Sequence, residues 1–143
     1  MPAPVRANKI NNPDDLQRAF AIRYEVFVSE QNCPPEIEVE FNDSSTHFIA
    51  YIGEEPVGAA RYRKTDKGYK LERFAVRAVF RGRGVAQELI KAVISDLPPD
   101  AHYIYLHAQS HAAGLYEKAG FKKEGDEFEE AGMKHFKMVL KHW

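Results

Sequence analysis

The stretch LERFAVRAVFRGRGVAQELIKAVISDL, residues 71–97, carries the strongest structural signal in the chain. Its first six residues, 71–76, form a mostly apolar run that predicts a buried β-strand. A basic turn follows, then Gly82 and Gly84, and then apolar residues at helical spacing from Leu89 to Leu97. Glycines let the backbone approach a ligand, and the first-turn amides of a helix have no carbonyl partner inside it. This order of elements therefore predicts an anion site for a phosphate or pyrophosphate.

The loop at residues 81–86 lacks the features of two common phosphate sites. No Gly-Lys-Ser/Thr sequence ends it, which argues against a P-loop nucleotidase. The pattern Gly82-x-Gly84-x-x-Gln87 misses the third glycine of a dinucleotide fingerprint and lies in mid-chain. The sequence Arg-Gly-Arg-Gly is also compatible with a solvated basic turn, so the loop alone leaves both interpretations open.

Length and composition indicate one globular domain over residues 1–143. The chain has a mass of 16.3 kDa, with 44% hydrophobic and 29% charged residues, which are ordinary globular values. Residues 1–6 have no apolar core of a signal peptide, and no run of about 18 apolar residues occurs. The single cysteine, Cys33, excludes an internal disulfide. We expect a cytoplasmic protein with neither a membrane nor a nucleic acid as partner.

Charge is unevenly distributed along the sequence. Residues 24–60 contain acidic side chains but no lysine or arginine, whereas residues 61–91 are rich in both. The basic segment surrounds the glycine loop and would attract a polyanionic ligand. The alternative is that both segments are solvated faces, as charge runs usually are.

The other segments predict alternating helices and strands. Asn12-Pro13 starts a helix on which Leu16, Phe20 and Phe27 form an apolar stripe. Arg23 lies on or beside this stripe and needs an anionic partner, an open pocket or a path to the surface. The remaining expected elements are a loop or short helix up to residue 45, hairpin strands over 46–52 and 57–62, a helix over 82–97, a strand over 103–108, a short helix over 110–119 and strands over 121–124 and 134–141.

The strand-helix-strand crossover from residues 71–76 to residues 103–108 implies that these two strands are parallel. We therefore expect an α/β fold with a mixed central sheet, in which antiparallel N-terminal strands precede one parallel pair and helices flank the sheet.

Two motifs resemble the GNAT N-acetyltransferase superfamily. Arg81-x-x-Gly84-x-Ala86, directly after a buried strand, is similar to the acyl-CoA motif of that family. Residues 115–121, LYEKAGF, resemble its helix-to-strand corner. Glu72-Arg73 and the late Ala-Gly-x-x-His segment, residues 131–135, look like those of a small bacterial-type branch. The resemblance covers about residues 46–140 well and the first 45 residues loosely.

The resemblance implies a GNAT fold with a splayed parallel strand pair, and acetyl-CoA as co-substrate without a metal. The backbone of Phe74, Ala75 and Val76 would pair with the pantetheine arm. The pyrophosphate would lie on the amides of Arg81, Gly82, Arg83, Gly84, Val85 and Ala86. Many relatives carry Asn where this chain has His107, and Gln109 would replace that cofactor contact. Arg23 and Arg73 are candidate acceptor contacts, and the family often forms homodimers.

The resemblance also implies roles in proton transfer. Tyr116 corresponds to the family's tyrosine near the thioester sulfur, where a phenol protonates the leaving thiolate; the alternative is an aromatic ring packed under the corner. The amine proton requires a base, and His135 and Glu72 are the candidates. Histidine titrates closest to neutral pH, whereas Glu72 needs burial or a bridging water. His135 would instead be an exposed strand histidine if it has no such role.

Three functions remain open from the sequence. The first is transfer of an acetyl group to a primary amine of a small molecule, and the second is a non-catalytic acyl-CoA-binding or sensory module of the same fold. The third is a thiol enzyme using Cys33. The acceptor is undetermined, because Arg23 and Arg73 favour a carboxylate-bearing amine while the acidic residues between 25 and 43 favour a polyamine or basic peptide.

Overall fold

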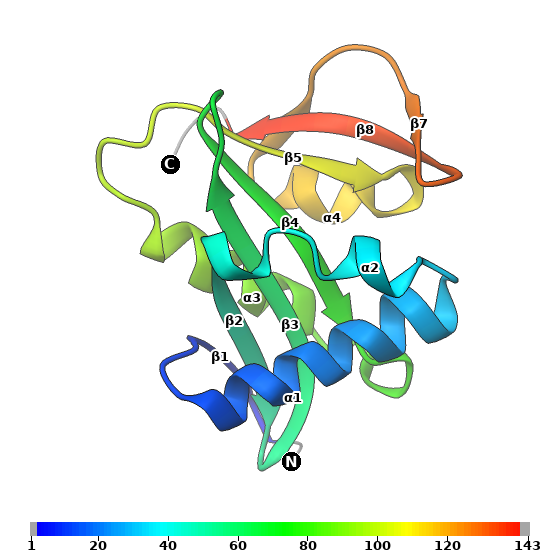
Figure 1. Cartoon of the computed structure of the whole chain (residues 1–143). Coiled ribbons are helices and arrows are strands. Elements are labelled where there is room, and N and C mark those ends of the chain that lie inside the picture. Colours follow the sequence, from blue (N-terminus) through cyan, green and yellow to red (C-terminus); the bar gives the residue numbers. More distant parts are fainter. Residues whose placement is uncertain (1–2, 141–143) are drawn as a thin grey trace. The chain divides into compact units, whose positions relative to one another are not determined.

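The computed structural model describes residues 3–140, so Met1, Pro2 and the expected end of the last strand at Lys141 lie outside the described part (Figure 1). The strands are β1 (Val5–Lys9), β2 (Ser45–Ile52), β3 (Glu55–Lys64), β4 (Tyr69–Val76), β5 (Ile104–Gln109), β6 (Phe121–Lys123), β7 (Phe128–Glu130) and β8 (Met133–Leu140). The helices are α1 (Pro13–Arg23), a π-helix (Tyr24–Glu30), α2 (Pro35–Glu38), α3 (Val85–Asp96) and α4 (Ala113–Lys118), with 3₁₀ turns at Asn42–Ser44, Ala78–Phe80 and Ser110–Ala112.

The strands form a mixed sheet. They hydrogen-bond in the order β1-β2-β3-β4-β5-β8-β6, and β7 pairs with β8. The β4–β5 pair is parallel, as the crossover predicts, whereas β5, β6 and β7 pair with β8 in the antiparallel direction. The α/β class with a mixed sheet and flanking helices is therefore confirmed.

The chain forms two compact units. The first comprises the residues up to Tyr62 together with Arg73–Leu97. The second comprises Arg63–Glu72 and the residues from Pro98 onward. The division falls within β4, between Glu72 and Arg73. The expectation of one domain over residues 1–143 stays a prediction.

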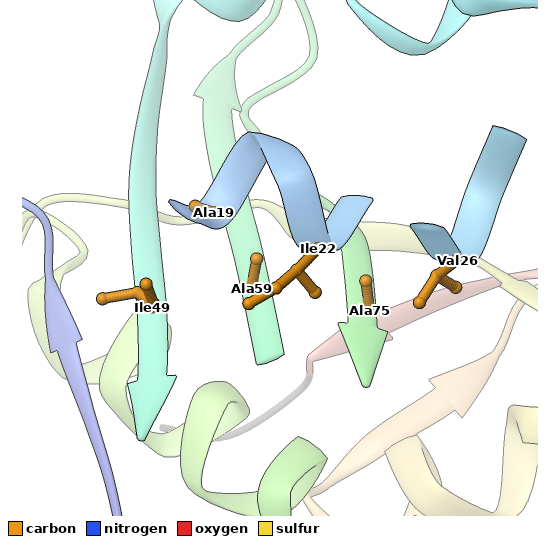
Figure 2. Close-up of a cluster of buried hydrophobic side chains, with 6 residues drawn as sticks. All are labelled: Ala19, Ile22, Val26, Ile49, Ala59 and Ala75. Atoms are coloured by element: carbon orange, nitrogen blue, oxygen red, sulfur yellow. The ribbon is translucent and has the colours of Figure 1, made fainter. Parts of the chain in front are cut away.

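In the first unit, α1 and the π-helix pack across the sheet (Figure 2). Asn12 caps α1, since its Oδ1 accepts a hydrogen bond from the Asp15 amide at 2.8 Å, and Pro13 follows in the first turn. The residues of the buried cluster are Ala19, Ile22 and Val26 from the helical segment and Ile49, Ala59 and Ala75 from the strands. The expected start of this helix is confirmed.

The buried face of α1 differs from the expected stripe. Leu16, Phe20 and Phe27 are only partly buried, while Ala19 and Ile22 are buried. The Phe20 ring instead lies edge-on to His47, with 5.3 Å between the ring centroids. Phe20 therefore lies against polar side chains, and the buried cluster is built from Ala19, Ile22 and Val26 of the helical segment and Ile49, Ala59 and Ala75 of the sheet.

The opposite face of the same strands carries α3. A Cβ atom at Gly58 of β3 would lie 2.7 Å from Val85 Cγ1 and 3.0 Å from Leu89 Cδ1. Adjacent strand residues point to opposite faces, so Gly58 faces α3 while Ala59 faces α1. The absence of a side chain at Gly58 thus lets the first turn of α3, directly after the glycine loop, contact the strand.

In the second unit, β8 pairs with three strands. Gln109 of β5 and Phe128 of β7 both lie opposite His135 of β8. The connection from β7 to β8 is the two-residue turn Ala131-Gly132, whose φ angles are 53° and 75°. Two left-handed residues form the tight hairpin turn that matches the twist of the strands. This turn sets which side chains of β7 and β8 share a face.

Candidate functional site

The glycine loop of the first unit has the geometry of an anion site. Gly82 and Gly84 adopt φ angles of 81° and 83°, which side-chain-bearing residues rarely adopt. A Cβ atom at either glycine would have no neighbour within 4 Å, so the loop is open on that side. Gly84 is the N-cap of α3 and provides no side-chain cap to the first-turn amides. These amides and the positive end of the helix dipole are suited to binding phosphate oxygens.

Two arginines near the loop already have acidic partners. Arg81 forms a two-pronged ion pair with Glu30, with both N–O distances 2.7 Å, and its Nε donates to the Val76 carbonyl at 3.0 Å. Arg77 contacts Glu25 at 3.2 Å and Glu55 at 2.7 Å. These contacts lower the pKa of Glu30 and raise the pKa of Arg81. The acidic and basic segments therefore meet here in ion pairs, and the loop amides are the groups suited to an anion.

The strand before the loop contains a left-handed residue. Arg73 of β4 has φ 60°, which is uncommon for a residue with a side chain. The parallel β4–β5 ladder joins residues 69–71 to residues 104–106, and β4 continues beyond it to Val76. Phe74, Ala75 and Val76 thus follow a local change of backbone direction. Their pairing with a pantetheine arm stays a prediction.

Arg23 and Arg73, the candidate acceptor contacts, both bind α2. Arg23 is 1% exposed, so the interpretation that it reaches the surface is wrong. Its Nε lies 2.6 Å from Glu38 Oε1, and its Nη2 donates to the Glu38 carbonyl at 2.8 Å. Arg73 donates to the carbonyls of Ile37 at 3.1 Å and Glu38 at 3.4 Å. Both guanidinium groups hold the end of α2, and their contact with an acceptor stays a prediction.

Tyr116, the candidate acid, lies in the second unit. It is 8% exposed, and its ring lies edge-on to Phe121, with centroids 6.2 Å apart. Gly120, with φ 102°, ends the helical segment that carries it, as expected for the corner. Burial raises the pKa of the Tyr116 phenol above its ordinary value, so the hydroxyl keeps its proton throughout the neutral range.

His135, one candidate base, is 7% exposed, so the alternative of an exposed strand histidine is wrong. Its Nδ1 lies 2.8 Å from the Met133 carbonyl. A carbonyl only accepts hydrogen bonds, so Nδ1 carries the hydrogen and Nε2 of the neutral ring holds a lone pair. That tautomer is the one that a base acting through Nε2 requires.

Glu72, the other candidate base, has cationic neighbours. Its Oε1 accepts a hydrogen bond from Arg63 Nε at 2.6 Å, and its Oε2 lies 3.5 Å from Lys70 Nζ. Both carboxylate oxygens are thus directed at cations of the same unit.

Sequence reasoning missed Glu130 of β7. Its Oε1 accepts a hydrogen bond from His107 Nδ1 at 3.0 Å, and its Oε2 lies 3.9 Å from His135 Nε2. The Phe128 ring contacts the rings of both histidines. The signal that could have found Glu130 is Ala131-Gly132, because a two-residue hairpin turn places the residues on either side of it opposite one another.

Two further expectations bear on the chemistry. Burial raises the pKa of the Cys33 thiol, which lowers the fraction of reactive thiolate and disfavours a thiol enzyme. Within residues 3–140, no group of three or more His, Cys, Asp or Glu side chains is arranged to hold a metal ion.

No helix in the described part of the chain is both long and apolar enough to cross a membrane.

Comparison with known proteins identifies the family. The profile of the acetyltransferase (GNAT) domain matches residues 10–142. The uncharacterized N-acetyltransferase YjcF of Bacillus subtilis is 40% identical over 131 residues, covering 90% of this chain and 94% of YjcF. Protein ElaA of Escherichia coli is 31% identical over 133 residues, covering 87% of this chain and 86% of ElaA.

Solved structures agree with this result. The crystal structure of Escherichia coli ElaA superposes with a TM-score of 0.79 at 26% identity, covering 99% of this chain and 100% of the ElaA chain. The structure of a Bacillus subtilis acetyltransferase in complex with CoA has a TM-score of 0.73 at 17% identity, covering 97% of this chain and 99% of that one, and shows likeness of fold. From the family profile and the curated relatives together, the chain belongs to the GNAT acetyltransferase family.

Proposed function

We propose that this protein transfers an acetyl group from acetyl-CoA to a primary amine of a small molecule. The observation that carries the proposal is the backbone of the glycine loop, in which two left-handed glycines lead into the first turn of α3. That arrangement suits the pyrophosphate of a CoA ester, and a fold relative is described in complex with CoA. Arg81 supports the loop through the Val76 carbonyl and Glu30, and its amide donates to the Ala78 carbonyl at 3.3 Å, so in this proposal the amides from Gly82 to Ala86 bind the pyrophosphate.

The proposed reaction is direct attack of the amine on the thioester. An alkylammonium group has a pKa near about 10, so a base must remove a proton before the nitrogen can attack at neutral pH. We assign this step to His135 Nε2, whose lone pair follows from the hydrogen bond at Nδ1. Glu72 is the alternative base, and its two cationic neighbours make it the weaker candidate.

The nitrogen bonds to the thioester carbonyl carbon, and collapse of the tetrahedral intermediate breaks the carbon–sulfur bond. The nitrogen loses two protons in all. One is released to solvent through His135, and the other restores the Tyr116 hydroxyl after Tyr116 has protonated the leaving thiolate. Tyr116 is suited to this role because burial keeps its phenol protonated until the thiolate forms.

The proposal is tested by thiol release from acetyl-CoA in the presence of a panel of primary amines, with mass spectrometry of the acetylated product. The informative variant is Gly84→Ala, because a methyl group at φ 83° strains the loop without meeting any neighbouring atom. We expect the apparent KM for acetyl-CoA to rise by about tenfold or more, since the amides lose their arrangement.

Gly53→Ala is the matched control. Gly53 also has a positive φ, 60°, and no neighbour within 4 Å of its Cβ position, but it lies in the β2–β3 turn. The Gly53→Ala substitution imposes a comparable backbone strain away from the glycine loop and should leave the KM for acetyl-CoA unchanged. Equal KM values in both variants would contradict the assignment of the loop. Binding of acetyl-CoA without turnover on any amine would instead support the non-catalytic module.

A further inference from the structure

The second unit contains a carboxylate between two histidine rings. Glu130 lies at the end of β7, with His107 on β5 and His135 on β8. In antiparallel pairs, directly opposed residues place their side chains on the same face. Phe128 and Gln109 both oppose His135, and alternation then places Glu130 and His107 on that face as well. The hairpin turn thus brings the carboxylate to the ring proposed as the base.

The hydrogen bonds assign each ring a role. The Glu130 carboxylate accepts from His107 Nδ1 at 3.0 Å, so His107 holds one of its oxygens. The other oxygen lies 3.9 Å from His135 Nε2, which is longer than a hydrogen bond but within the distance of an ion pair. The opposite nitrogen of His135 donates to Met133. An anion therefore lies near His135 Nε2, the nitrogen that would capture the proton.

The Glu130 carboxylate stays charged over the working range. Its hydrogen bond with His107 lowers its pKa below the ordinary value, with smaller effects from Lys70 and His135. Several other charged groups on the packed strands form ion pairs of their own: Glu72 with Arg63 and Lys70, Lys134 with Glu127, and Lys137 with Glu124. The Glu130 side chain is 46% exposed, so solvent partly screens its charge.

The ring of Phe128 completes the arrangement. It stacks on His135 with centroids 5.9 Å apart and lies edge-on to His107 at 5.1 Å. The hydrogen bond from Nδ1 to the Met133 carbonyl and this stack together restrict rotation of the His135 ring. A carboxylate that is itself held by a second residue and faces a restricted imidazole is suited to stabilising an imidazolium ion.

We propose that Glu130 is a positioning residue that acts through His135 by stabilising the imidazolium formed when His135 takes the amine proton. This inference rests on the proposed function and adds a residue to it. The proton moves from the ammonium to His135 Nε2 and then to solvent, while Glu130 remains a carboxylate throughout. His107 fixes the Glu130 oxygen that faces away from His135.

The first test is an NMR titration of the imidazole C–H signals in the free protein, which requires no substrate. Glu130→Gln keeps an oxygen that accepts from His107 but removes the charge. We expect the His135 signals to respond to protonation at lower pH than in the wild type, because the negative charge that faces the protonated ring is gone. Glu130→Asp, which keeps the charge on a shorter side chain, should restore part of the shift. Glu129→Gln is the matched control, because Glu129 neighbours Glu130 on β7 and points to the opposite face, and it should leave the midpoint unchanged.

The second test is kinetic and uses an amine from the panel above. Glu130→Gln should lower kcat by about tenfold, move the acid limb of the pH profile to lower pH, and leave the KM for acetyl-CoA and the melting temperature unchanged. In a His135→Ala background, the same substitution should have no further effect on the profile. An unshifted His135 titration, or a shifted titration with unchanged kcat, overturns the inference. Absence of acetyl transfer by the wild type, despite the NMR shift, overturns the proposed function itself.

Discussion

Arg23 and Glu38 form an ion pair in which both side chains are almost fully buried, with Nε and Oε1 2.6 Å apart. The pair joins the last residue of α1 to the end of α2, and Arg73 adds hydrogen bonds to the same end of α2. Two buried charges lose their hydration, so neither side chain is tolerated there without the other.

Removal of one partner should therefore destabilise the protein more than removal of both. We expect Arg23→Met to lower the free energy of unfolding by about 3–5 kcal/mol, because Glu38 is left as a buried unpaired charge. The double variant Arg23→Met/Glu38→Leu should recover most of this loss. Urea denaturation measures the free energy of unfolding of the single and the double variant. Lys91→Met, which removes an exposed ion pair with Glu88, is the control and should change the free energy by less than about 1 kcal/mol. A double variant as unstable as the single one would contradict this account.

Gly58 should couple the sheet to the glycine loop. In Gly58→Ala the new methyl group would lie 2.7 Å from Val85 Cγ1 and 3.0 Å from the Ala75 carbonyl oxygen. The start of α3 must then shift, and we expect a loss of about 1–3 kcal/mol in stability together with a raised KM for acetyl-CoA. Gly114→Ala in α4 meets no atom within 4 Å and should preserve both quantities. A normal KM in folded Gly58→Ala would show that the loop does not depend on this contact.

Tyr116→Phe should separate acid catalysis from packing. Phenylalanine keeps the ring against Phe121 but removes the hydroxyl, so the leaving thiolate loses its proton donor. We expect kcat to fall by about 10² while acetyl-CoA binding, measured by calorimetry, is retained. Binding and rate lost together would indicate that the hydroxyl has a structural role instead.

His47 should make the fold sensitive to mild acid. Burial lowers the pKa of His47, with Arg23 and Arg61 adding repulsion, while its Nε2 donates to the Asn42 carbonyl at 2.8 Å. The unfolded chain, with a histidine pKa of about 6.5, then binds the proton more readily than the fold. The contribution of neutral His47 to the free energy of unfolding is thus fully present above about pH 6.5 and is lost as the pH falls below that value.

The matched variant is His47→Gln, whose side-chain amide can also donate to Asn42. It should flatten the stability curve between about pH 7 and pH 5, measured by urea denaturation at several pH values. Carboxylates with lowered pKa values, such as Asp15 and Glu130, contribute losses only below about pH 4.5, so the two effects separate. An equally steep loss in His47→Gln would assign the sensitivity to another group.

Most of the fold could be predicted from local patterns. Periodicity or turn residues indicate the β2–β3 hairpin, β4, the glycine loop, α3, β5, the corner after α4 and β8. β1 and β7 could not be predicted in this way. β1 is largely exposed, and the three residues of β7 include two glutamates, so both strands depend on pairing with a neighbour.

The candidate site was only partly predictable for the same reason. The spacing of Arg81, Gly84 and Tyr116 lies within short motifs, but the partner of each charged side chain comes from a distant segment. Glu30 is 51 residues from Arg81, and Glu130 is 23 residues from His107. Charge runs indicate which sign each segment carries, whereas only the tertiary structure shows that these acids and bases neutralise one another.

The Ala131-Gly132 turn makes chain length a determinant of the chemistry. His135 keeps its face through its pairing with Gln109 of β5, so one extra residue that shifts β7 by one position against β8 would turn Glu130 to the opposite face of the sheet. The late Ala-Gly-x-x-His motif thus fixes the number of residues between the hairpin turn and the imidazole of His135. An insertion in this turn would therefore separate Glu130 from His135 even if every side chain of the segment were kept.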